Sequence, residues 1–350
     1  MYDAVAHFEA LYAYVEGAFS FAAETRATWL AWREAFRPRL RQILGLDNIA
    51  LDVAGYEPRA ERDEVLDMGD YLRESWHLWV EPTVPLPFYL LRPKDMTGPR
   101  RYTSPLPLVL TPHGHNRPHV YVGIAHTDHE RESIEAGERD IAVQAVREGY
   151  LTIAPTTRAF GETRTPRDKT EDTVHSCRTQ LMHDLLVGRT PIGDRVWDMS
   201  RLIDWAVATQ GVDAERIAIT GNSGGGTVSL FAAACDTRIS VAVPSSYFCT
   251  FTGSIGAMHH CDCNYVPGIL RLGEMYDVAG LVAPRAFCAI SGKDDPIFPI
   301  EHARFAFERL KHIYAVAGVP DKCEHYIGPA GHRYYKDGAW PFIRKHFGLV

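Results

Sequence analysis

The chain has 350 residues, of which 46% are hydrophobic and 23% are charged. This composition is typical of a globular protein and excludes both a disordered chain and a protein built from membrane-spanning helices. The net charge of −7 shows no excess of positive charge for nucleic acid or for an anionic membrane. We therefore expect neither of these partners and predict a small-molecule ligand.

The cysteines and the start of the chain both favour a cytoplasmic location. Seven cysteines, an odd number spread over a long chain, predict mostly buried, reduced thiols rather than a disulfide framework. The first 22 residues lack a basic segment followed by an uninterrupted apolar run. No signal peptide is therefore expected.

The N-terminal residues 1–60 predict a helical extension. Apolar residues recur every three or four positions from Val5 to Phe19 and again from Trp29 to Ile43, the pattern of two amphipathic helices. We expect Pro38 to kink or break the second helix and Gly45 to end it. The extension is expected to pack on the rest of the chain or on another copy, and a homo-oligomer would form through these helices.

The residues from 61 to 350 predict one catalytic domain around a sheet. Alternating runs at 65–68, 76–80 and 88–91 indicate an antiparallel meander. Nearly continuous apolar runs follow, and helix-like segments separate most of them, as in a parallel sheet with helices on both faces. These runs lie at 106–110, 150–154, 217–220, 240–243 and 287–290. The predicted fold class is therefore α/β, with a mostly parallel central sheet.

The strongest local motif surrounds Ser223. An apolar strand leads into Gly221-Asn222-Ser223-Gly224-Gly225, and an alanine-rich helix follows, which is the context of a nucleophile elbow. The residues two before and two after the serine approach each other too closely for a Cβ, and glycine occupies both positions. The turn places Ser223 at a helix N-terminus, where free N–H groups favour the negative charge of a tetrahedral intermediate. A glycine-rich turn that only connects strand to helix is the alternative.

A serine nucleophile needs a base and a carboxylate that orients it. The apolar run at 286–290 ends in a polar loop with two adjacent carboxylates, Asp294 and Asp295, and the pattern does not choose between them. His332 lies in a glycine-rich loop after the last predicted strand, 323–327, and is the candidate base. His325 lies within that strand, so we expect it to be structural.

A second oxyanion donor is expected from the loop after residues 106–110. This loop contains His113-Gly114-His115, and the N–H groups of His115 and Gly224 are the candidate pair. The alternative, that His113 and His115 bind a metal, lacks a third ligand nearby in sequence. The segment His259–Cys263 also holds four potential metal ligands, but no second pair of ligands follows it as a zinc site would usually require. We expect residues 250–274 to form a loop or cap over the pocket instead.

The order of strand, nucleophile elbow, acid and base along residues 60–350 resembles that of an α/β-hydrolase. The chain is similar to the branch that contains acetyl xylan esterase-like, dienelactone hydrolase-like and prolyl-oligopeptidase-like enzymes. The segments that carry this similarity are 113–115, 212–217, 236–239, 263–268 and 277–285. In this branch the catalytic aspartate stands three residues after a glycine and four before a proline. The resemblance therefore implies Asp295, between Gly292 and Pro299, as the acid and His332 as the base.

These observations together predict a serine esterase that needs no cofactor and no metal and cleaves short-acyl carboxylic esters through an acyl-enzyme. A prolyl-oligopeptidase-like peptidase or an acyltransferase with the same triad is one alternative. A catalytically silent receptor or scaffold is another. We expect residues 119–129, 158–164 and 248–265 to line the pocket, with Cys261 and Cys263 at its mouth.

Overall fold

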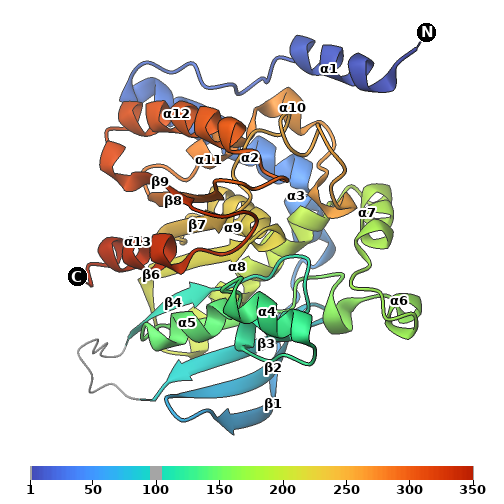
Figure 1. The fold of residues 1–350 in the computed structure, drawn as a ribbon, viewed down its shortest axis with the longest axis vertical. Helices are drawn as coiled ribbons and strands as arrows, with labels where there is room; N and C mark the ends of the chain where they lie inside the picture. Colours follow the sequence, from blue (N-terminus) through green and yellow to red (C-terminus); the bar gives the residue numbers. More distant parts are fainter. Residues whose placement is uncertain (1, 95–104, 350) are drawn as a thin grey trace.

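The computed structural model describes residues 2–94 and 105–349. A nine-stranded sheet crosses the molecule, in the order β1-β2-β3-β5-β4-β6-β7-β8-β9 (Figure 1). The strands are β1 Ala60–Asp67, β2 Tyr71–Glu81, β3 Val84–Pro93, β4 Leu106–Leu110, β5 Leu151–Pro155, β6 Val212–Asn222, β7 Val241–Ser245, β8 Ala286–Gly292 and β9 Cys323–Gly328.

The sheet has an antiparallel part and a parallel part. Strands β1, β2 and β3 form the predicted antiparallel meander, and β3 pairs antiparallel with β5. From β5 to β9 every neighbouring pair is parallel. Strands β4 to β8 are buried along their whole length except for the first half of β6, which explains their uninterrupted apolar sequences.

Helices cover both faces of the parallel part. Helices α8, α9 and α12 pack on one face, whereas α5 and α13 pack on the other. The helices are α1 Ala4–Tyr14, α2 Arg26–Leu44, α3 Leu46–Asp52, α4 Asp128–Glu135, α5 Ile141–Arg147, α6 Pro166–Thr170, α7 Cys177–Leu186, α8 Pro191–Thr209, α9 Gly224–Cys235, α10 Ile269–Leu272, α11 Met275–Gly280, α12 Ile300–Val316 and α13 Lys336–His346. The predicted α/β fold class is confirmed.

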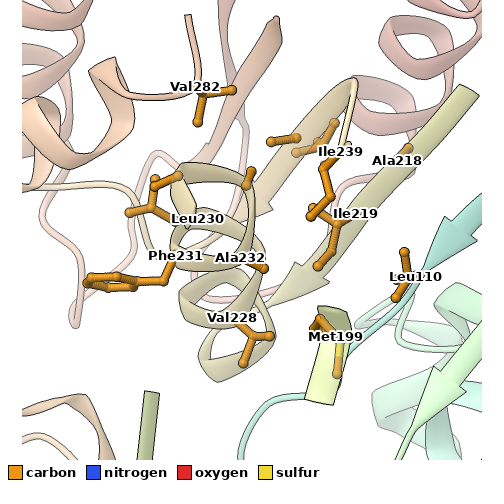
Figure 2. Close-up of a cluster of buried hydrophobic side chains, with 14 of the residues drawn as sticks. Leu110, Met199, Ala218, Ile219, Val228, Leu230, Phe231, Ala232, Ile239 and Val282 are labelled. Atoms are coloured by element: carbon orange, nitrogen blue, oxygen red, sulfur yellow. The ribbon is translucent and has the colours of Figure 1, made fainter. Parts of the chain in front are cut away.

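Helix α9 lies at the centre of the hydrophobic core. All of its residues are buried, and its apolar side chains face β6, α8 and the segment after α11 (Figure 2). Val228 and Phe231 of α9 and Ile219 of β6 are fully buried in this cluster. Such packing fixes the start of α9, and therefore the elbow that precedes it, to the sheet.

Helix α2 of the N-terminal extension packs into the same core. Its residues Trp29, Phe36, Leu40 and Leu44 are buried. The helix continues through Pro38, so the predicted break does not occur, and it ends at Gly45, whose φ of 83° confirms the predicted left-handed cap.

Hydrogen bonds tie α2 to segments far along the chain. The Arg37 guanidinium donates to the carbonyl oxygens of Ala234 and Leu281, at 2.9 and 2.7 Å. Ala234 lies in the last turn of α9 and Leu281 directly follows α11, so α2 packs over the C-terminal ends of both helices. The boundary at residue 60 therefore separates segments that share one core.

Helix α1 differs from α2 because it buries none of its residues. It ends at Tyr14, five residues before the predicted end at Phe19, and lies at the periphery of the molecule (Figure 1). Association of copies through the N-terminal helices stays a prediction. Among the described helices, none combines the length and the apolar character that crossing a membrane requires.

Candidate active site

Ser223 occupies a strained turn between β6 and α9. Its φ of 58° and ψ of −120° lie where few residues other than glycine are found. A Cβ on Gly221 would lie 2.9 Å from Gly225 Cα and 2.3 Å from the carbonyl oxygen of Pro112. The crowding that the sequence predicted around the elbow is therefore present, and it holds Ser223 at the carboxyl end of the sheet.

The second aspartate of the pair, Asp295, contacts the candidate base. His332 Nδ1 lies 2.8 Å from Asp295 Oδ2, and because an ionised carboxylate only accepts, Nδ1 is the donor. Asp295 Oδ1 accepts the backbone N–H groups of Ile297 and Phe298, which fix the carboxylate. Asp294 is exposed and makes no such contact with His332 within the described residues.

Ser223 and His332 face one cavity of about 270 Å³. The other lining residues are His115, Arg139, Gly224, His259, His260, Cys261, Asn264, Ile297 and Phe298. In residues 2–94 and 105–349, no hydrogen bond joins Ser223 Oγ to the His332 ring. Such contacts are often loose before substrate binds and tighten in the complex. His325 bonds Ser291 on the neighbouring strand and does not line this cavity.

The loop after β4 lies directly against the elbow. A Cβ on Gly114 would lie 3.1 Å from Gly224 N and 3.2 Å from Ser223 Cβ, so only glycine allows this approach. Within the described residues the backbone N–H groups of His115 and Gly224 have no protein acceptor. Two free donors beside the serine are what an oxyanion hole requires.

The side chain of His113 holds this loop in place through two hydrogen bonds. It is buried, donates through Nδ1 to the Gly114 carbonyl at 2.7 Å and accepts the Thr157 N–H at 2.9 Å. Burial lowers the pKa of His113 to about 3, so the ring is neutral. Both ring nitrogens are occupied, and His113 is not free to bind a metal.

Two of the three segments expected to line the pocket lie elsewhere. Residues 119–129 and 158–164 contribute to two other cavities, of about 890 and about 420 Å³. The larger one lies beside β2 and β3 and contains none of Ser223, Asp295 and His332. Volume alone would favour that larger cavity as the active site. The strained serine and the histidine paired with Asp295 instead identify the smaller cavity as the candidate active site.

Residues 248–265 do reach the cavity, through the loop expected to cover it. Cys261 lines the cavity and is partly exposed, whereas Cys263 is buried at 1% exposure behind it. The prediction that both thiols lie at the mouth is therefore wrong for Cys263. All seven cysteines lie in the described part of the chain, and none of them forms a disulfide there.

Comparison with known proteins gives a consistent result. A family model of fungal glucuronyl esterases matches residues 179–257, which include the elbow. YtaP of Bacillus subtilis strain 168, a protein assigned as a hydrolase, is 25% identical over 253 residues, 70% of this chain and 77% of YtaP.

Solved structures match almost the whole chain. A protein from Bacteroides fragilis assigned as an acetyl xylan esterase has a TM-score of 0.76 at 17% identity, over 97% of this chain and 84% of its own. A glucuronoyl esterase from Solibacter usitatus has a TM-score of 0.64 at 15% identity, over 96% of this chain and 99% of its own. The chain has the α/β-hydrolase fold. In this chain, Ser223, Asp295 and His332 follow one another in the order usual for the fold.

Proposed function

We propose that this α/β-hydrolase is a serine esterase that cleaves carboxylic esters through an acyl-enzyme. One observation carries the proposal. A serine in a strained turn faces the same cavity as a histidine whose other ring nitrogen is bonded to a buried aspartate. The likeness to esterases in the comparisons supports the same reaction class.

In the proposed reaction, Ser223 Oγ attacks the ester carbonyl while His332 Nε2 takes its proton. Nδ1 is held by Asp295, so Nε2 is the nitrogen left for this transfer. The N–H groups of His115 and Gly224 stabilise the oxyanion. His332 returns the proton to the leaving alcohol, and water then hydrolyses the acyl-enzyme by the same steps in reverse order.

The cavity favours a small, polar ester. A volume of about 270 Å³ leaves little room for a long acyl chain. Four histidines and Arg139 line it beside Ile297 and Phe298, so most of the lining residues carry side chains that can form hydrogen bonds. Acetylated or uronoyl sugar esters, the substrates named for the similar structures, have this chemistry.

The test combines a covalent probe with a substrate panel. A fluorophosphonate should label Ser223 in the folded protein, and Ser223→Ala should abolish labelling. The same substitution should lower kcat for an aryl acetate by a factor on the order of 10⁴ to 10⁶. Aryl esters of increasing acyl length, acetylated sugars, a glucuronoyl ester and aminoacyl anilides form the panel. Faster turnover of the anilides would favour a peptidase, and absence of labelling would favour a silent receptor.

A further inference from the structure

Four potential metal ligands that are scattered in the sequence converge beside the candidate active site. They are His115 from the loop after β4, Cys177 from the start of α7, and Cys261 and Cys263 from the loop that covers the cavity. Their ligand atoms all lie within 4.8 Å of one another. Cys263 Sγ lies 3.3 Å from His115 Nε2 and 3.5 Å from Cys261 Sγ.

These separations match the edges of a tetrahedral zinc site. Zn–S bonds of about 2.3 Å and Zn–N bonds of about 2.0 Å place a nitrogen and a sulfur ligand about 3.5 Å apart, and two sulfur ligands about 3.8 Å apart, at tetrahedral angles. The distances from Cys263 Sγ to His115 Nε2 and to Cys261 Sγ are each only a few tenths of an ångström shorter than these values. A set of three sulfur atoms and one imidazole is also the ligand chemistry that zinc prefers.

The surroundings of the cluster provide a second, independent argument. Arg195 is buried at 2% exposure, and its Nη2 lies 3.6 Å from Cys177 Sγ. In the described part of the chain, no carboxylate lies within ion-pair distance of Arg195, whereas the neighbouring Arg158 contacts three. A buried guanidinium without an anion is costly. Zinc bound by three thiolates and a neutral imidazole has a net charge of −1, which Arg195 would balance.

We propose that His115, Cys177, Cys261 and Cys263 bind one Zn²⁺ ion in a closed, tetrahedral site. Binding displaces three thiol protons to solvent and occupies His115 Nε2, which leaves the ring proton on Nδ1. A disulfide is the competing use of these thiols, but it would join only two of the three and would not use the His115 ring nitrogen that faces Cys263. A closed site with four protein ligands is typical of structural zinc.

The site would fix the geometry of the candidate oxyanion hole. His115 supplies both a zinc ligand and a proposed oxyanion donor, and its Nδ1 lies 3.2 Å from the point that a Cβ on Gly224 would occupy. The ion would therefore join the loop after β4 to the loop that covers the cavity. Only this consequence rests on the proposed esterase function, because metal binding can be measured without activity.

The first experiment measures metal in the full-length protein. After purification with a non-thiol reductant and dialysis against metal-free buffer, we expect one zinc ion per chain by mass spectrometry. X-ray absorption at the zinc edge should show three sulfur ligands at about 2.3 Å and one nitrogen ligand at about 2.0 Å. A folded, reduced protein that contains no zinc and takes up none on addition of Zn²⁺ would overturn the proposal. A spectrum with only oxygen and nitrogen ligands would do the same.

The second experiment uses matched variants. Cys177→Ser should lose the zinc ion, because this residue is a proposed ligand but does not line the cavity. Cys323→Ser, which removes another buried thiol, should retain it. Ser223→Ala should also retain it, so failure of the esterase proposal would leave this result unchanged. Equal zinc in the Cys177→Ser and wild-type proteins would exclude Cys177 and refute the site as proposed. If Cys177→Ser does not fold, the zinc-edge absorption spectrum of the wild-type protein alone decides whether the proposed ligands bind zinc.

Discussion

The substitution Gly114→Ala should reduce catalysis without unfolding the protein. The new Cβ would lie 2.6 Å from the Asn222 carbonyl oxygen, 3.1 Å from Gly224 N and 3.2 Å from Ser223 Cβ. None of these atoms belongs to a flexible side chain, so the loop itself must move away from the elbow. Relief of the shortest contact, 2.6 Å to the Asn222 carbonyl oxygen, requires a shift of about 0.9 Å, because non-bonded heavy atoms prefer separations of about 3.5 Å or more.

A movement of this size acts directly on the proposed oxyanion hole. Donors there work when they lie about 2.7 to 3.1 Å from the oxyanion, and losing one costs about 10²- to 10³-fold in kcat. Because Gly114 precedes His115, we expect Gly114→Ala to lower kcat by about 10²-fold while KM changes much less.

The assay is steady-state hydrolysis of an aryl acetate, with active sites counted by a fluorophosphonate and Tm measured in parallel. Gly331→Ala is the control, because the nearest atom to its new Cβ is 3.3 Å away and belongs to the Asp294 backbone. This variant should lose far less activity, although it lies beside His332. Wild-type kcat in a Gly114→Ala protein of unchanged Tm would refute the role of this close approach.

Three further predictions concern the acid, the buried charges and the N-terminal extension. Asp295→Asn should lower kcat by about 10⁴-fold, whereas Asp294→Asn should have little effect; equal effects would contradict the assignment. Arg158→Met should lower the free energy of unfolding by about 3 to 5 kcal/mol at pH 8, because three buried carboxylates lose a shared cation and, unlike Glu81 and Asp194, Asp198 has no second ion-pair partner among the described residues. Burial raises the pKa of Asp198 to about 6, so the folded state binds a proton there that the unfolded chain releases above about pH 4. Because Arg158 lowers the pKa of Asp198, its removal should raise that pKa further, and protonation at pH 5 should stabilise the variant more than the wild type. The deficit in Arg158→Met should therefore shrink at pH 5, and chemical denaturation at both pH values measures it. Phe36→Ala should cost about 3 to 5 kcal/mol of unfolding free energy, whereas a peripheral extension would tolerate the change.

The sequence was most informative where the physical constraint is local. The two glycines around Ser223 follow from steric crowding within five residues, and the structure has that crowding. The pairing of His332 with Asp295 rather than with Asp294 was implied by a family resemblance, because periodicity alone could not separate two adjacent carboxylates. The geometry now distinguishes them, since only one is buried against the histidine.

Features that depend on convergence of distant segments were not predictable. His115 and Cys177 are 62 positions apart, and no ligand spacing connects them with Cys261 or Cys263. The helical period predicted α2 but not that Phe36 would enter the central core. Residues 119–129 and 158–164 were expected to line the pocket, but a sequence does not determine which cavity a loop faces.

The bonds from Arg37 to the Ala234 and Leu281 carbonyls have a consequence for how the protein is made. Helix α2 is synthesised early, but the second acceptor of Arg37, Leu281, lies 244 residues further along the chain. At about 5 to 20 residues per second, the ribosome needs roughly 10 to 50 s to reach that partner. Helix α3 is made directly after α2, but α8, α9 and α12, which also pack on α2, all follow residue 190, so much of its apolar face lacks native cover for part of this interval. A chaperone could therefore bind this apolar face during translation, in competition with the native partners of α2. The packing of α2 on the rest of the core would then be among the last steps of folding.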